Sequence, residues 1–134
     1  MADLTITAAN VAVTSGETET GTAGAAITAG QVVFKNASGN FALADADDTS
    51  LDEVYGIALN GAASGQPLEV AKSGCSITIG ATLTAGLAYY LSATAGGIAP
   101  YADLVADDRV IYLGSATSTS VLAFRPFDTG VILA

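Results

Sequence analysis

The sequence contains one unit twice, and this repeat limits what the chain can fold into more than any other feature. Residues 22–30 read TAGAAITAG and residues 78–86 read TIGATLTAG, with six of nine positions identical at a spacing of 56. An apolar run follows each copy, QVVF at 31–34 and LAYY at 87–90, and a turn of small polar residues follows each run. At a spacing of 58, the later matches are Ala44-Asp45 with Ala102-Asp103, Gly56 with Gly114, and Ala58 with Ala116. Such an ordered series indicates duplication of one supersecondary unit.

The duplication predicts the same strand order in residues 22–71 and in residues 78–124. Gly30 and Gly86 close equivalent motifs, so we expect them at equivalent turns or bulges, where glycine adopts a positive φ without strain. The repeated residues are Ala, Gly and Thr, which are structural residue types. The repeat itself therefore predicts a scaffold and no chemistry.

Short alternating segments separated by glycine-rich turns make up both copies. No stretch has the sustained helical stripe of apolar residues with caps that a surface helix needs. Strands at this spacing are typical of sandwiches and barrels. We expect an all-β fold, a small β-sandwich or barrel built from a duplicated strand unit, with extended terminal segments. Residues 1–134 should form a single domain, with residues 1–20 as an N-terminal arm and residues 4–13 as a strand or pair of strands.

Composition and charge argue against several classes of function. Thirteen acidic and four basic residues give a net charge of −9, whereas nucleic-acid binding needs Lys and Arg to neutralise phosphates. The longest apolar run is far shorter than the ~20 residues that span a bilayer, and the first residues lack the pattern of a secretory signal. The single cysteine, Cys75, excludes an intrachain disulfide and is expected to be a small packed thiol. We therefore expect neither a nucleic-acid partner nor a membrane partner.

Catalytic chemistry is not indicated by the sequence. Histidine, the commonest general base, is absent, and no nucleophile, phosphate-loop or zinc-protease motif occurs. The acidic segment DADDTSLDE at 45–53 offers oxygen ligands for Ca²⁺, but its spacing does not match the EF-hand loop, so a solvated loop is the preferred interpretation. We expect no enzyme, no catalytic residues, no cofactor and no metal site.

The C-terminal segment VLAFRPFDTGVILA has a composition that is favoured at protein interfaces. Aromatic residues and Arg are enriched at the buried centres of interfaces, and the alternating N-terminal strand offers further apolar residues. The predicted interface residues are Leu4, Ile6, Phe124, Arg125, Phe127 and Ile132. The alternative is that the C-terminal segment closes the core of its own domain, and the sequence leaves both open.

Three stretches, ITAGQVVF, VYGIALNGAASGQPLEV and ITIGATLTAGLAYYLSATAGGIAP, resemble the small capsid decoration, or cement, proteins of tailed bacteriophages. The resemblance covers most of residues 20–116. It implies a β-rich protein, often a homotrimer, that binds the outer surface of the head and ties neighbouring major capsid proteins together. It also implies a location in the virion after synthesis in the host cytoplasm. The family has no catalytic residues, and its contacts form no motif that can be placed on this chain.

A second interpretation is a non-enzymatic structural or carbohydrate-contacting β-module of a phage fibre or a cell-surface protein. Aromatic platforms flanked by polar residues would favour this interpretation. The chain has no Trp, five Tyr and four Phe, so such platforms have few residues to draw on.

Overall fold

The computed structural model describes residues 4–46 and 53–132, and these residues form an all-β structure, as predicted. The only helical elements in the described ranges are two single turns of 3₁₀-helix, η1 and η2. The elements are η1 (Ala8–Asn10), β1 (Ala12–Ser15), β2 (Thr18–Thr22), β3 (Val32–Lys35), β4 (Phe41–Leu43), β5 (Gly56–Ala58), β6 (Pro67–Ala71), β7 (Ser76–Thr78), β8 (Ala88–Leu91), β9 (Ile98–Pro100), η2 (Tyr101–Asp103), β10 (Arg109–Ala116) and β11 (Val121–Ile132).

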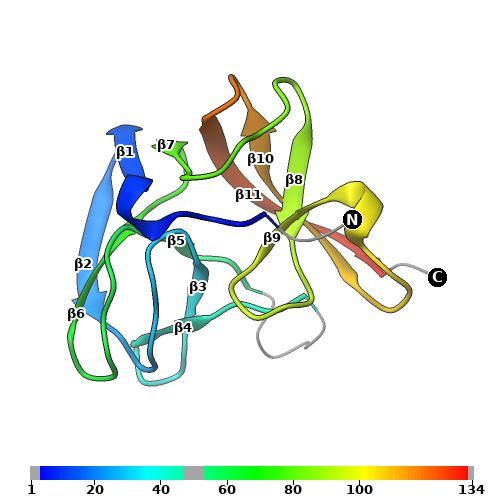
Figure 1. Cartoon of the computed structure of the whole chain (residues 1–134). Helices are drawn as coiled ribbons and strands as arrows, with labels where there is room; N and C mark the ends of the chain where they lie inside the picture. Colours follow the sequence, from blue (N-terminus) through cyan, green and yellow to red (C-terminus); the bar gives the residue numbers. More distant parts are fainter. Residues whose placement is uncertain (1–3, 47–52, 133–134) are drawn as a thin grey trace.

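Two antiparallel sheets pack together and share one strand order (Figure 1). The five-stranded sheet has the order β2-β6-β5-β3-β4. The six-stranded sheet has the order β1-β7-β11-β10-β8-β9, so after β1 it repeats the first order with each strand number raised by five. The two halves of the chain therefore have the common strand order that the repeat predicts.

The repeated glycines make the same backbone contacts in both units. Gly30 donates a hydrogen bond to the carbonyl of Ala58 (2.8 Å), and Gly86 donates one to the carbonyl of Ala116 (2.7 Å). Both glycines have a positive φ, 92° for Gly30 and 85° for Gly86, which a residue with a Cβ rarely adopts. In each unit, the glycine of the repeated TAG motif thus lies in a turn. This turn contacts the strand that contains the repeated Gly-x-Ala motif.

The core lies between the sheets and is filled by aliphatic side chains from both units. One cluster joins residues such as Val32 and Ile57 of the first unit to Ile77, Leu113 and Phe124 of the second. A second cluster lies within the first unit, around Phe41. The first sheet curls enough for Ala23, just after β2, to form a parallel bridge with Phe41 of β4, so its two edges approach each other.

The predicted N-terminal arm, residues 1–20, is wrong in its extent. Residues 12–15 form β1, which pairs with β7 at the edge of the larger sheet, and β2 already begins at Thr18. The sequence could not show this because β1 belongs to neither repeated unit, and its pairing depends on where β7 lies. Only residues 4–11 precede the first strand among the described residues.

Candidate interaction surface

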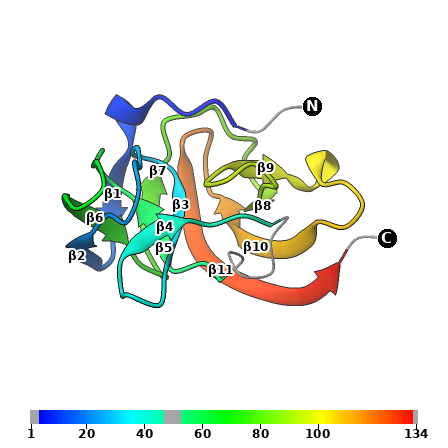
Figure 2. The same cartoon turned by 90° about the horizontal axis from the view of Figure 1, so that it is seen from below.

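The last strand, β11, consists of two halves with different surroundings. In the inner half, Val121–Phe124, half-buried and buried residues alternate, and β7 and β10 pair with it on either side. In the outer half only Pro126 is half-buried and the other residues are exposed, and the described pairing is with β10 alone. Figure 2 shows β11 as a long curved strand that runs along one side of the molecule to the C-terminus. The inner half closes the core, and the outer half presents side chains to solvent.

Phe124 was predicted as an interface residue, and the structure corrects this assignment. Its side chain is fully buried in the domain's own core, so it cannot contact a partner. Phe127, three residues further along the same strand, is 65% exposed, and Ile132 is 52% exposed. The inner half of the C-terminal segment thus closes the domain's own core, and the outer half is exposed.

A strip of four aromatic side chains crosses the outer face of the six-stranded sheet, and we call it the aromatic strip: Tyr101, Tyr90, Tyr112 and Phe127. Tyr112 of β10 lies directly opposite Tyr90 of β8 on one side and opposite Phe127 of β11 on the other. Directly opposed residues of antiparallel strands point to the same face of the sheet. Tyr101 extends the strip, because its ring lies 5.6 Å from that of Tyr90.

The tyrosines of the aromatic strip pack edge to face. The planes of Tyr90 and Tyr101 meet at 65°, and those of Tyr90 and Tyr112 meet at 75° with centroids 5.9 Å apart. This is a favourable arrangement for aromatic pairs, and it fixes the rings to one another. The hydroxyls of Tyr112 and Ser115 share a hydrogen bond of 2.6 Å, which further orients Tyr112. The three tyrosines are therefore preorganised, and the two ends of the strip, Tyr101 (52%) and Phe127 (65%), are exposed.

Sequence reasoning found Phe127 but missed the three tyrosines. In the run LAYY, neighbouring side chains of the strand point to opposite faces of the sheet, and the sequence does not show which tyrosine faces outward. In the structure Tyr89 is buried and Tyr90 is half-exposed. The alternation of β8 and β10 was visible in the sequence. Their side-by-side pairing, which places Tyr90 opposite Tyr112, was not.

The free edge of the outer half of β11 is unsuited to regular strand addition. Pro126 has no amide hydrogen to donate there. Gly130 has a φ of 74°, and its amide donates to the Asp128 carboxylate (2.9 Å), which bends the strand. Such features protect exposed strand edges from pairing with other chains. A partner would therefore meet the side chains of this region rather than its backbone.

Beside this edge lies a shallow hollow of about 260 Å³. Its lining joins β11 to the segment before β5 and comprises Glu53, Val54, Ile111, Pro126, Phe127 and Asp128. Phe127 thus takes part in both the aromatic strip and the hollow. The carboxylates of Glu53 and Asp128 give the hollow a negative rim.

The other predicted interface residues lie apart from one another. Leu4 and Ile6 are half-buried and pack against the chain's own core, on the N-terminal segment. Arg125 is exposed at the point where β11 leaves the core, and its guanidinium reaches the carbonyl of Phe124 (3.4 Å). Arg125, Phe127 and Ile132 are exposed positions along one strand, β11.

A separate polar cluster lies on the five-stranded sheet. Glu19 of β2 accepts an ion-pair contact from Lys35 (2.6 Å) and a hydrogen bond from the Tyr55 hydroxyl (2.6 Å), while the Lys35 ammonium lies 4.6 Å from the centre of the Tyr55 ring. Lys35, and then Tyr55, lower the pKa of Glu19 below its ordinary value of 4.5, and Glu19 in turn raises the pKa of Lys35. These groups satisfy one another, so the cluster joins β2, β3 and the segment before β5.

The acidic segment 45–53 lies mostly outside the described residues, because 47–52 are not among them. Among residues 4–46 and 53–132, no three acidic or cysteine side chains are grouped so as to hold a metal ion. Cys75 is buried, with its sulfur 2.9 Å from the carbonyl oxygen of Glu17. In the part of the chain that the structure describes, no helix is long and apolar enough to cross a membrane.

Comparison with known proteins adds no family to this description. The sequence matches no protein-family model, and no curated protein is significantly similar to it. The candidate function therefore rests on the residues and on their arrangement.

Proposed function

We propose that this protein is a capsid decoration protein, which binds the outer surface of an assembled phage head through contacts with the major capsid protein. The proposal joins the resemblance of the strand motifs to decoration proteins with the surface described above. We further propose that it acts as a homo-oligomer, a trimer by that resemblance, and that it stabilises the head in the virion.

The aromatic strip is the observation that carries the proposal. Three tyrosines that pack edge to face lie in one row with Phe127 on the sheet, and Arg125 lies on the same strand as Phe127. Tyr, Phe and Arg are the residue types that dominate binding energy at protein interfaces. Rings that are already fixed to one another lose little conformational freedom when a partner covers them.

Charge and repetition support the same function. A net charge of −9 does not favour capture by the packaged genome, because DNA binding requires cationic side chains. A shell presents many equivalent sites, so copies that are linked in an oligomer gain avidity from contacts that are individually weak. Binding to the assembled shell alone would shift the equilibrium away from rupture by mass action.

A pull-down on heads from the same phage that lack the protein tests the proposal. The double variant Tyr101→Ala/Phe127→Ala should sediment with heads much less than the wild type, because it removes both exposed ends of the aromatic strip. Thr20→Ala is the matched control, since Thr20 is exposed on the other sheet and should leave binding unchanged. Wild-type protein that does not bind such heads, or a double variant that binds as well as the wild type, would refute the proposal.

The second candidate, a carbohydrate-contacting module, also draws on the tyrosines. Aromatic rings that stack on sugars present their faces to the ligand. Here the rings of Tyr90 and Tyr101 meet at 65°, and the Tyr90 ring packs against both Tyr101 and Tyr112. The geometry thus favours a protein partner. Binding of the wild type to an array of bacterial glycans, lost in the same double variant, would establish the second candidate instead.

A further inference from the structure

The N-terminal segment, residues 4–7, occupies a gap that exists in only one of the two units. In the first unit, Gly24 donates a backbone hydrogen bond directly to Phe41 (2.7 Å), which closes the space between the strand ends. The equivalent residues of the second unit are Gly80 and Ile98. There the closing bond is replaced by two bonds to the N-terminal segment: Leu4 donates to Ile98 and Thr7 donates to Gly80, both at 2.8 Å.

The comparison of the two units defines a strand-acceptor groove, by which we mean the gap between Gly80 and Ile98. The first unit shows that the fold can close this gap with its own backbone. The second unit keeps the gap open and fills it with four residues from outside the repeat. The segment is therefore an insert into the second unit rather than one of its strands.

Glycines shape the path of the insert. A Cβ on Gly80 would lie 2.5 Å from the carbonyl oxygen of Thr7, and a Cβ on Gly30 would lie 2.6 Å from the Ile6 side chain. Both contacts are closer than real Cβ atoms allow. Gly80 and Gly30 belong to the repeated motifs, so the groove is built from the same TAG-type turns that organise the fold.

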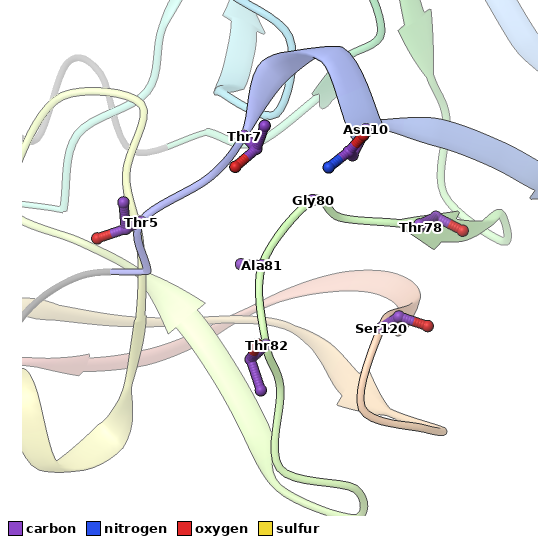
Figure 3. A pocket seen from close by; sticks show the side chains of 8 residues that line it. All are labelled: Thr5, Thr7, Asn10, Thr78, Gly80, Ala81, Thr82 and Ser120. Carbon is purple, nitrogen blue, oxygen red and sulfur yellow. The ribbon is translucent and has the colours of Figure 1, made fainter.

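The insert fills its groove incompletely (Figure 3). On one side, Thr5, Thr7 and Asn10 line a hollow of about 620 Å³ together with the segment 78–82, and Figure 3 shows the Asn10 side chain beside Gly80. On the other side, Leu4 and Ile6 line a hollow of about 240 Å³ toward the turns at 28–31 and 94–97. Leu4 and Ile6 remain half-exposed, and η1, which joins the insert to β1, has no buried residue. None of residues 4–10 is fully buried, and Val11 is the first buried residue along the described chain.

The side chains that line the two hollows are uncharged, although the chain has a net charge of −9. Two copies of an acidic protein repel each other over most of their surfaces, and like charges brought together at a contact are costly. A neutral groove with a neutral insert is thus a place where a second copy can approach.

We propose that the strand-acceptor groove exchanges its insert between copies, so that residues 4–7 of one copy occupy the groove of another. The exchanged segment would make the same two backbone bonds and bury the same two apolar side chains as it does within its own chain. Exchange of an identical element is a low-cost route to an oligomer, because it creates few new contacts. This inference does not depend on the capsid proposal.

Cross-linking between full-length chains tests the exchange. Thr5→Cys and Thr82→Cys place thiols on the insert and on the groove, at exposed positions that line the same hollow. The two single variants are mixed at concentrations up to roughly millimolar, since a tethered segment competes at an effective concentration of that order, and treated with a short bismaleimide. The wild type controls for reaction at Cys75, which is buried. A single chain that carries both substitutions is the positive control for reach.

We expect a cross-linked pair of one Thr5→Cys chain and one Thr82→Cys chain, which increases with protein concentration. The pair should be lost when Leu4→Asp/Ile6→Asp is added to the donor chain, because carboxylates cannot replace the two apolar side chains. Thr20→Cys mixed with Thr82→Cys measures random collision, since Thr20 lies on the other sheet. Cross-linking within the doubly substituted chain, with none between mixed chains above the Thr20→Cys level, would overturn the proposal.

Discussion

Phe124 and Phe127 form a matched pair that tests the division of β11. They are three residues apart on one strand, and the same substitution, Phe to Ala, removes the same atoms from each. Phe124 is fully buried, whereas Phe127 is 65% exposed. Any difference between the two variants therefore reports their surroundings rather than their chemistry.

The expected magnitudes follow from burial. Phe124→Ala removes a ring from a packed core and leaves a cavity, which costs about 3–5 kcal/mol of unfolding free energy. Fully burying a phenylalanine is worth about 1.5–3 kcal/mol, and about a third of Phe127 is buried, so Phe127→Ala should cost only about 0.5–1 kcal/mol. For a domain with a total stability of about 5–15 kcal/mol, the first loss is severe and the second is small.

Urea unfolding of the purified variants, followed by tyrosine fluorescence or circular dichroism, measures both losses on one scale. We expect the midpoint of Phe124→Ala to fall sharply with an unchanged slope, and the midpoint of Phe127→Ala to stay close to that of the wild type. In the pull-down, Phe127→Ala should bind heads less well than Phe124→Ala, because folded Phe124→Ala keeps the aromatic strip. Equal destabilisation by the two substitutions would refute the division of β11 into a core half and a surface half.

Two further predictions concern single residues. Gly114→Ala should destabilise the fold by about 1–3 kcal/mol through overpacking, because a Cβ there would run into the carbonyl oxygen of Ala123 in the neighbouring strand. In the same urea assay, the control Gly61→Ala should change the stability by no more than about 0.5 kcal/mol, because its Cβ would lie 3.8 Å from the nearest atom, the carbonyl oxygen of Ile27. Because Lys35 lowers the pKa of Glu19, the ion pair should stabilise the protein above pH 4.5 and lose this effect as the pH falls through the lowered pKa. The stability difference between the wild type and Glu19→Gln should therefore be present at pH 7 and shrink in acid, and a difference independent of pH would contradict this assignment.

The sequence determined the architecture through local rules that act over a few residues. The alternation of apolar residues set the strands, and glycine at positions such as 30 and 86 set the turns, because only glycine adopts a positive φ without strain. Duplication then predicted that both halves share one strand order, since two similar units fold in similar ways. Gly-x-Ala recurs at 56–58 and at 114–116, and in both copies the carbonyl of its Ala accepts a hydrogen bond from the glycine of the turn.

Tertiary structure decided which side chains meet. Tyr90 and Tyr112 lie far apart in the chain and become neighbours only because β8 pairs with β10. Phe124 and Phe127 are equivalent residue types in the sequence. Phe124 is buried and Phe127 exposed because β7 pairs only with the inner half of β11. The insertion of residues 4–7 between Gly80 and Ile98 was equally hidden. Pairing and burial are long-range properties, because they depend on the packing of segments that local sequence patterns do not relate.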